Sequence, residues 1–348
     1  MICSKNINEI SSFWEQGTTA MDPQLQLCTI TSFTAHHNGF FHLFIANDFL
    51  RIYASIVPLN IEKTIPYLSK TAFISSVLKK LRPNVLYLTN PFLTNLKSYS
   101  SKNNFAIEDV LSAVNEPYGL LIIPDFFEEK VSFDNTYVKI EVEPEMHLKI
   151  QPYWNSIETY KNDLKRKYRL KINAIEKKTK TIDIRLLNHD QLIEKNTVLQ
   201  QLFDQVFDVA KFSGPKLNTA VLMDLVKIKY LKVYGFFYEG KMIGFSSFFE
   251  QNDDLYSYYV GFDKTINKSI PIYGRMILFS IEQAILLKKK VLYFGRTASE
   301  YKSNFGSVPV KSYVYVKFKN RLLNRFFQPY IKNIQPHSWV QRRPFKKA

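Results

Sequence analysis

The sequence is poor in the residues that build the commonest cofactor and nucleophile sites. Its two cysteines, Cys3 and Cys28, and its six histidines are too few and too scattered for a zinc site or a disulfide framework. It contains no G-x-x-x-x-G-K-S/T phosphate loop and no G-x-G-x-x-G turn. The Gly244–Phe248 segment lacks the second glycine of a nucleophile elbow. We therefore expect no metal and no covalent intermediate, which favours direct transfer between two bound substrates.

Long hydrophobic runs are also missing. The apolar runs 118–127 and 277–287 are too short to span a bilayer, and residues 1–16 lack the apolar centre of a signal peptide. Together with the sparse cysteines, this predicts a cytoplasmic protein without a transmembrane helix. A chain of 348 residues that is 46% hydrophobic can nevertheless build two well-packed domains.

Positive charge is concentrated in two segments. Residues 161–180 hold nine Lys/Arg and two acids, and residues 311–348 hold ten Lys/Arg and no acid. Their net charges of +7 and +10 account for the +16 of the whole chain, so the remainder is close to neutral. Basic patches suit a polyanionic partner, although a solvated helix surface is a serious alternative for the first of them.

The order of expected elements suggests two related halves. In the second half, strands at 233–238, 242–250 and 255–262 precede a helix at 271–288, a buried strand at 291–295 and a later strand at 313–318. The first half is a weaker copy, with strands at 40–46 and 51–58, a helix at 65–81, a strand at 85–88, a helix at 107–114 and a strand at 120–123. This pattern predicts an α/β fold of two tandem lobes, each a mixed, mostly antiparallel sheet flanked by helices.

The predicted division has four parts: an N-terminal lobe at 1–145, a basic linking helix at 146–180, a C-terminal catalytic lobe at 181–320 and a basic amphipathic tail at 321–348. In the linking helix, apolar residues three or four apart from Ile157 to Ile175 form one stripe. Lys165 and Arg169 lie beside the stripe at helical spacing, and we expect them to bind an acceptor.

A polar loop follows the buried strand 291–295. It presents Arg296, Thr297 and Lys302 just beyond the end of the strand, where ligands bind in open α/β sheets. The stretch Tyr293-Phe-Gly-Arg-Thr-Ala-Ser-Glu-Tyr-Lys302 resembles the Gly-Arg-Thr…Lys element of the Fem-type and peptidoglycan-biosynthesis-like branch of the GNAT transferases. Residues 154–178 are similar to the W…Y…L…YR…I…A…K stretch of the same families, so the resemblance covers roughly residues 140–320.

The resemblance implies two GNAT-like lobes and a thioester or aminoacyl donor that is attacked by an amine. In simple GNAT enzymes, a glycine-rich turn before the central helix holds the donor's pyrophosphate. The matching positions here are Gly261 and the turn Ile272, Tyr273, Gly274 and Arg275, which depart from the usual glycine pattern. A helix N-terminus still attracts anions. The donor therefore stays open between acyl-CoA, an acyl carrier protein and an aminoacyl-tRNA.

Catalysis requires a base for the amine, stabilisation of an oxyanion and a proton for the leaving group. The candidates are Arg296 and Lys302 as ligand-binding or oxyanion groups, Tyr259 among the tyrosines of strand 255–262 as an acid, and Asp263 as a base. For each of these residues, simple packing or a surface salt bridge is the competing interpretation. We expect Thr297 to contact the acceptor.

The tail indicates where the acceptor is found. From Phe318 onward, large apolar residues occupy one side of a helical wheel and Arg321, Arg325 and Lys332 the other, which is typical of an interfacial anchor. Trp339 and Phe345 stand among further cations. The first hypothesis is therefore an N-acyltransferase that acts on a lipid-like or amino-acid-derived amine at the inner, anionic membrane surface.

Two other hypotheses remain. One is a Fem-type aminoacyl-tRNA-dependent transferase in cell-wall precursor synthesis, although the sequence has no heptad arm for the coiled-coil insertion usual in that group. The other is a non-enzymatic nucleic-acid-binding protein that uses the two basic segments. No recognition motif or string of aromatic residues accompanies the charge, so we expect nucleic acid not to be the partner.

Overall fold

The structure is a computed structural model that describes residues 1–16, 22–59, 83–210 and 214–346. The helix expected at 65–81 lies outside these residues. The chain divides into two compact units, each assembled from several segments: residues 1–142, 211–217 and 312–336 in the first, and 143–210, 218–311 and 337–348 in the second. In the described part of the chain, no helix is both long and apolar enough to cross a membrane.

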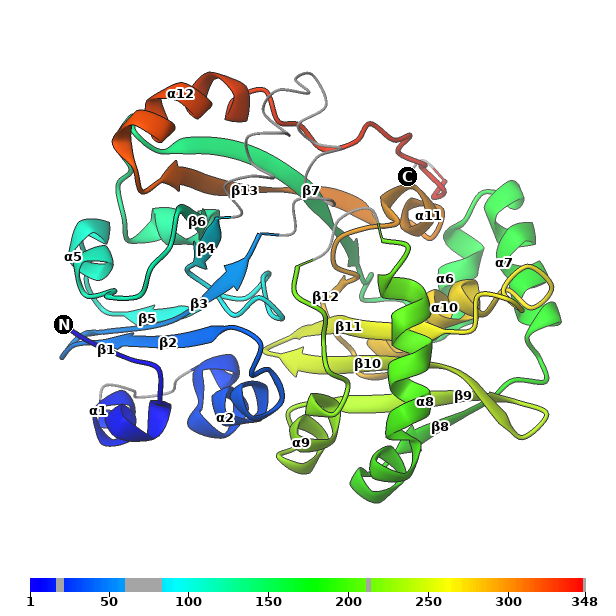
Figure 1. Ribbon diagram of the computed structural model, residues 1–348. Helices are drawn as coiled ribbons and strands as arrows, with labels where there is room; N and C mark the ends of the chain where they lie inside the picture. The colour runs from blue at the N-terminus through cyan, green and yellow to red at the C-terminus, as the bar shows by residue number, and fades with distance from the viewer. Residues whose placement is uncertain (17–21, 60–82, 211–213, 347–348) are drawn as a thin grey trace. The chain divides into compact units, whose positions relative to one another are not determined.

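The first unit is built on a mixed sheet with short helices (Figure 1). The predicted hairpin is present, with Phe41 opposite Ile56 and Ala46 opposite Arg51, and β4 runs parallel to β6 as its neighbour. The strand order is β1 (Ile2–Ser4), β2 (Phe41–Ala46), β3 (Leu50–Pro58), β4 (Asn84–Tyr87), β6 (Leu120–Pro124) and β13 (Val308–Phe318), and β5 (Tyr99–Ser101) pairs with β3. The α-helices are α1 (Ser11–Gln16), α2 (Leu27–His36), α5 (Ile107–Ser112) and α12 (Arg321–Ile331).

The second unit has one parallel strand pair in an otherwise antiparallel sheet. Gly261 faces Phe203 of α8 while the next residue, Phe262, stacks on Tyr273 of α10, so these helices cover opposite faces of the sheet (Figure 1). The strand order is β7 (Val138–Lys149), β12 (Val291–Tyr293), β11 (Asp254–Phe262), β10 (Lys241–Gln251), β9 (Lys232–Tyr238) and β8 (Asp183–Leu187). The helices are α6 (Ile157–Asp163), α7 (Arg166–Lys178), α8 (His189–Phe207), α9 (Val221–Lys227), α10 (Ile272–Leu286) and α11 (Ser299–Ser303).

Local sequence explains several of these boundaries. The hairpin between β9 and β10 turns at Glu239 and Gly240, both with positive φ, which is the conformation that matches strand twist in a two-residue turn. Helix α8 begins at a capping box in which Asn188 and Gln191 each accept a backbone N–H from the other. The expected order of strands and helices in the second half is confirmed.

The prediction of one long linking helix was wrong. The helix stops at Asp163 and restarts at Arg166, because Leu164 adopts an extended conformation and forms a bridge with Phe345 from the end of the chain. The Lys165 N–H donates to the Pro344 carbonyl (2.8 Å) and the Lys346 N–H to the Asp163 carbonyl (2.9 Å).

The aromatic residues of the tail pack on protein. Phe345 lies against Trp154 and Tyr160, with ring centroids 5.6 and 6.1 Å away. A Cβ on Gly306 would stand 2.2 Å from the Phe345 ring, so this glycine leaves room for it. Trp339 also packs on the core of the second unit. The tail residues beyond α12 therefore form part of this unit, where the sequence predicted membrane contact.

Candidate functional site

The parallel strands β11 and β12 pair over only three residues and then stop pairing. Their register runs from Asp254 opposite Val291 to Tyr256 opposite Tyr293, where β12 ends. Strand β11 continues to Phe262 and stays paired only with β10 on its other edge, with a bulge between Ser246 and Phe248 of that partner. Beyond Tyr256, alternate peptide groups of β11 therefore have no partner from β12, and we call the place where the two strands stop pairing the opening. This opening is the candidate site.

A row of rings crosses the sheet at the base of the opening. His147 of β7 contacts Tyr293 of β12, Tyr293 stacks on Tyr256 of β11, and Tyr256 stacks on Phe249 of β10, with centroid separations of 4.2, 4.2 and 4.7 Å. The Tyr293 hydroxyl donates to Asp254 (3.2 Å). The row follows directly from the register, because these residues are cross-strand neighbours on one face.

Next to this row, the buried Glu145 forms an ion pair with the partly exposed Arg296. The Arg296 Nη2 lies 3.5 Å from Glu145 Oε1, and His147 Nε2 lies 3.4 Å from Glu145 Oε2. Only 7% of Glu145 is exposed. A carboxylate held between a guanidinium and an imidazole can accept a proton from a substrate that enters the opening.

Sequence reasoning placed Arg296 correctly at the strand end but missed Glu145 and His147. The signal was available, because residues 138–149 alternate almost perfectly between apolar and charged side chains. A two-residue period predicts a strand and puts Glu145, His147 and Lys149 on one face. The predicted boundary of the first lobe, at residue 145, falls inside this strand.

Lys302 holds the loop that follows β12, residues 294–298, which we call the exit loop. Its ammonium donates to the carbonyl oxygens of Phe294 (2.9 Å), Gly295 (3.2 Å) and Arg296 (2.8 Å). Burial lowers the pKa of Lys302 to about 7, and the negative charge of Glu145 opposes this shift. With all three N–H bonds of the ammonium engaged, Lys302 acts as a positioning residue for Arg296.

Thr297, the remaining candidate residue of the exit loop, is exposed. Thr297 and Ala298 both have positive φ, at 67° and 50°, which is uncommon for residues with a Cβ. The three carbonyl contacts of Lys302 are formed next to this turn, so they help to keep it in place. Thr297 and Ala298 are the exposed residues of the exit loop.

Tyr259 and Asp263 have structural partners. Tyr259 points to the α8 face, where its ring meets Phe203 edge-on at 5.5 Å, and burial raises its pKa. Asp263 Oδ1 accepts from the Thr265 N–H (2.9 Å) and hydroxyl (2.6 Å), which caps the turn after β11. Neither belongs to the cluster around Glu145.

The expected pyrophosphate site at the start of α10 is tightly packed. The Tyr273 N–H already donates to Asn267 Oδ1 (3.1 Å), and Ile272 is fully buried. A Cβ on Gly274 would stand 2.7 Å from the Tyr301 hydroxyl, so this glycine serves close packing of the helix. Arg275 is engaged by Glu282 (2.9 Å). A Cβ on Gly261 would likewise meet the α8 backbone within 2.6 Å.

Two of the three residues expected to bind the acceptor, Lys165 and Arg169, lie at the start and in the first turn of α7. Lys165 Nζ donates to the Arg343 carbonyl (3.0 Å), so it anchors the C-terminal segment. Arg169 is half-buried on α7. The structure gives neither of them a contact with the exit loop in the described residues.

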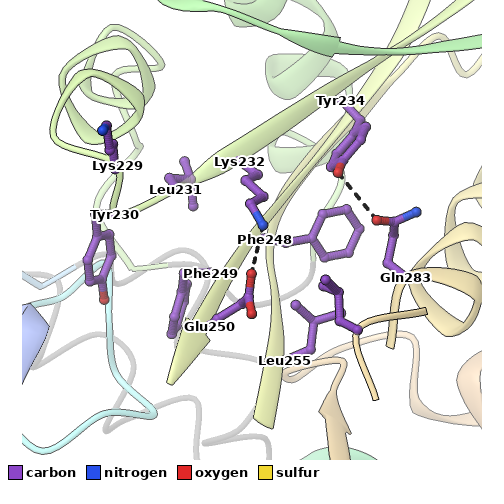
Figure 2. A pocket seen from close by; sticks show the side chains of 11 residues that line it. Lys229, Tyr230, Leu231, Lys232, Tyr234, Phe248, Phe249, Glu250, Leu255 and Gln283 are labelled. Carbon is purple, nitrogen blue, oxygen red and sulfur yellow. Dashed lines mark hydrogen bonds and ion pairs between the residues drawn. The ribbon is translucent and has the colours of Figure 1, made fainter. Parts of the chain in front are cut away.

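A separate small pocket lies between β9, β10 and α10 (Figure 2). Its volume is about 80 Å³, well below the few hundred Å³ of ordinary ligand pockets. Two interactions across it, Lys232 with Glu250 (2.7 Å) and Tyr234 with Gln283 (3.3 Å), draw its walls together. This pocket is too small to hold an activated donor.

No protein-family model and no curated protein matches the sequence. Solved structures do. The chain is similar to L-PGS from Bacillus licheniformis (TM-score 0.54, 10% identity, 95% of this chain and 98% of that one). It is also similar to FemX (0.50, 9%, 94% and 100%) and to the C-terminal domain of a putative lysylphosphatidylglycerol synthetase from Agrobacterium fabrum (0.54, 8%, 92% and 97%). The likeness extends over both units and shows that this chain shares the fold of these proteins. The predicted α/β fold, with mostly antiparallel strands flanked by helices, is confirmed.

Proposed function

We propose that this protein is a transferase that moves an acyl or aminoacyl group from an activated carrier to the amine of an acceptor. The observation that carries the proposal is the opening between β11 and β12, with the Glu145–Arg296 pair at its side. The names of the similar structures support it, since FemX and lysylphosphatidylglycerol synthetase share this fold.

In the proposed reaction, the acceptor amine attacks the carbonyl carbon of the donor ester or thioester. Glu145 takes the proton that the nitrogen loses, and the Arg296 guanidinium together with peptide N–H groups of the β11 edge stabilises the oxyanion. The carbon–sulfur or carbon–oxygen bond then breaks, and the leaving group takes up a proton. The products are an amide and the free carrier.

A lipid-like amine is the acceptor we favour, and α12 supports this choice. Leu322, Phe326 and Tyr330 lie one turn apart on its outer face and are 80%, 46% and 39% exposed. Arg321 and Arg325 flank them, and the helix has no acid. Exposed apolar side chains beside cations fit an anionic membrane surface, so we propose peripheral association with the inner face of a membrane.

Incubation of the purified protein with amine lipids tests the proposal. Acyl-CoA, an acylated carrier protein and an aminoacyl-tRNA are supplied in separate reactions, and mass spectrometry detects an amide product. Glu145→Gln should lower the rate of the productive reaction by about 10² or more, as expected for loss of a general base. Glu143→Gln, on the same strand, is the matched control. Absence of an amide with all three donors, or equal rates for the two variants, contradicts the proposal.

A further inference from the structure

A basic groove lies in the second unit between α7, α11 and the C-terminal segment. Its volume is about 540 Å³, within the range of pockets that hold cofactor-sized ligands. Its cations are Lys167 and Lys171, one turn apart on α7, and Arg342 from the C-terminal segment. The Arg342 N–H donates to Ser303 Oγ (3.1 Å), so the backbone that carries the guanidinium is fixed to α11.

The charges in the groove do not balance. Glu300 is the one acid among its lining residues, and it pairs with Arg342. Lys171 Nζ donates to the neutral Asn304 Oδ1 (3.2 Å). Burial, followed by the charges of Arg342 and Lys167, lowers the pKa of Lys171. A bound anion relieves this repulsion among like charges.

The walls of the groove are aromatic. Tyr168 and Tyr301 line it, and Lys171 Nζ lies 5.4 Å from the centre of the Tyr301 ring. Cations that grip phosphates beside rings that receive a base are the arrangement by which single-stranded nucleic acids and nucleotides are held. A lone inorganic anion would use only the cations and leave most of the volume unfilled.

The groove is linked to the candidate site through α11. Lys302 of this five-residue helix points inward and holds the exit loop, while its neighbours Glu300 and Tyr301 line the groove. A ligand seated in the groove therefore lies against the same element that positions Arg296. The α10 N-terminus, by contrast, already has Asn267 as a partner.

We propose that the groove formed by Lys167, Lys171 and Arg342 binds the phosphates of a nucleotide-bearing ligand. The identification of this ligand as the carrier of the transferred group rests on the proposed function, but binding itself does not. Two nucleotide sources share the required chemistry: coenzyme A and the end of an RNA strand.

Direct binding measurements test the inference. Fluorescence anisotropy follows a labelled eight-nucleotide single-stranded RNA, and unlabelled coenzyme A or inorganic phosphate competes with it. The double variant Lys167→Gln/Lys171→Gln should weaken binding at least about tenfold and reduce the slope of log K against log salt by about 1.4, since each phosphate contact on a single strand contributes about 0.7. Competition by coenzyme A below millimolar concentration assigns the groove to both nucleotide sources, and its failure restricts the ligand to RNA.

The matched control is Lys177→Gln/Lys178→Gln, which removes the same charge from the exposed last turn of α7. Equal loss in the two double variants, competition by inorganic phosphate at the same concentration as coenzyme A, or no binding of RNA and coenzyme A overturns the inference. Binding with the expected variant effects but without amide formation leaves the groove in place and refutes the proposed function. Amide formation at an unchanged rate in Lys167→Gln/Lys171→Gln leaves the proposed function in place and refutes the assignment of the carrier to this groove.

Discussion

Lys302→Met separates the positioning role of this lysine from its effect on stability. Methionine keeps much of the side-chain volume and removes the ammonium that joins the carbonyls of Phe294, Gly295 and Arg296. The exit loop then loses the contacts that hold Arg296 against Glu145. We expect turnover to fall at least about tenfold, because small displacements of a catalytic group have large effects on rate.

The effect on stability is the difference of two large terms. The carbonyls of Phe294 and Arg296 lose their donor, which costs about 1 to 3 kcal/mol each, whereas the Gly295 carbonyl still accepts from the Met146 N–H (3.1 Å). Against this, the variant no longer buries a charge, and a pKa lowered from 10.5 to about 7 corresponds to a penalty of about 5 kcal/mol. The terms largely cancel near neutral pH, so the free energy of unfolding should change by only about 2 kcal/mol there.

The pH dependence provides the sharper measurement. Between about pH 7 and 10.5, Lys302 is neutral in the folded protein and protonated in the unfolded chain. The unfolded state therefore binds the extra proton, and the stability of the wild type rises with pH by up to about 1.4 kcal/mol per unit relative to Lys302→Met. Urea denaturation at pH 7 and pH 9, followed by tryptophan fluorescence, should show this divergence.

Lys290→Met is the control, because Lys290 is an exposed lysine of the same unit whose pKa is raised by its hydrogen bond to Asp253. Its difference from the wild type should not grow between pH 7 and pH 9. A constant difference for Lys302→Met over the same interval would refute the reasoning about its buried ammonium.

Two further predictions concern the first unit. Leu322→Ser/Phe326→Ser should lower co-sedimentation with anionic vesicles about tenfold or more, whereas Leu286→Ser, at a site 72% exposed in the second unit, should not; equal effects argue against α12 as the lipid-binding element. Burial lowers the pKa of His37 to about 4 from 6.5, so stability is retained above pH 6.5 and falls by up to about 3 kcal/mol as the pH drops to 4. His37→Gln should flatten this acid dependence in denaturant titrations, and an unchanged dependence means that another group is responsible.

Periodicity and turn residues were sufficient to predict most of the second unit. The strands that form β9, β10 and β11 are rich in aromatic and β-branched residues and are separated by residues that tolerate positive φ, such as Gly240 and Asn252. These signals come from neighbouring residues, so they predict the strands without any knowledge of tertiary contacts. The prediction of one long linking helix was wrong because the helix breaks at Leu164 through a long-range contact with Phe345, which local signals do not reveal.

The site was only partly predictable for a similar reason. Arg296 and Lys302 follow a strand end, which a sequence can locate. The direction in which Lys302 points depends on a turn that includes Thr297 and Ala298 at positive φ, and neither residue type signals that conformation. Glu145 comes close to Arg296 only because its strand pairs with β12, nearly 150 residues further along the chain, as His147 opposite Tyr293 shows. A local sequence pattern does not reveal such a long-range pairing.

The return of the chain end to the α6–α7 break has a consequence for the order of folding. Lys165 and the Arg343 carbonyl that it contacts are separated by 178 residues, and residues 312–336, which belong to the first unit, are synthesised between them. During translation, the backbone groups at the break between α6 and α7 therefore form their hydrogen bonds only after residues 344–346 have been synthesised. A fragment that ends near residue 311 would leave Trp154 and Tyr160 without the Phe345 ring, so the second unit is not expected to behave as an autonomous piece when it is cut at its apparent boundary.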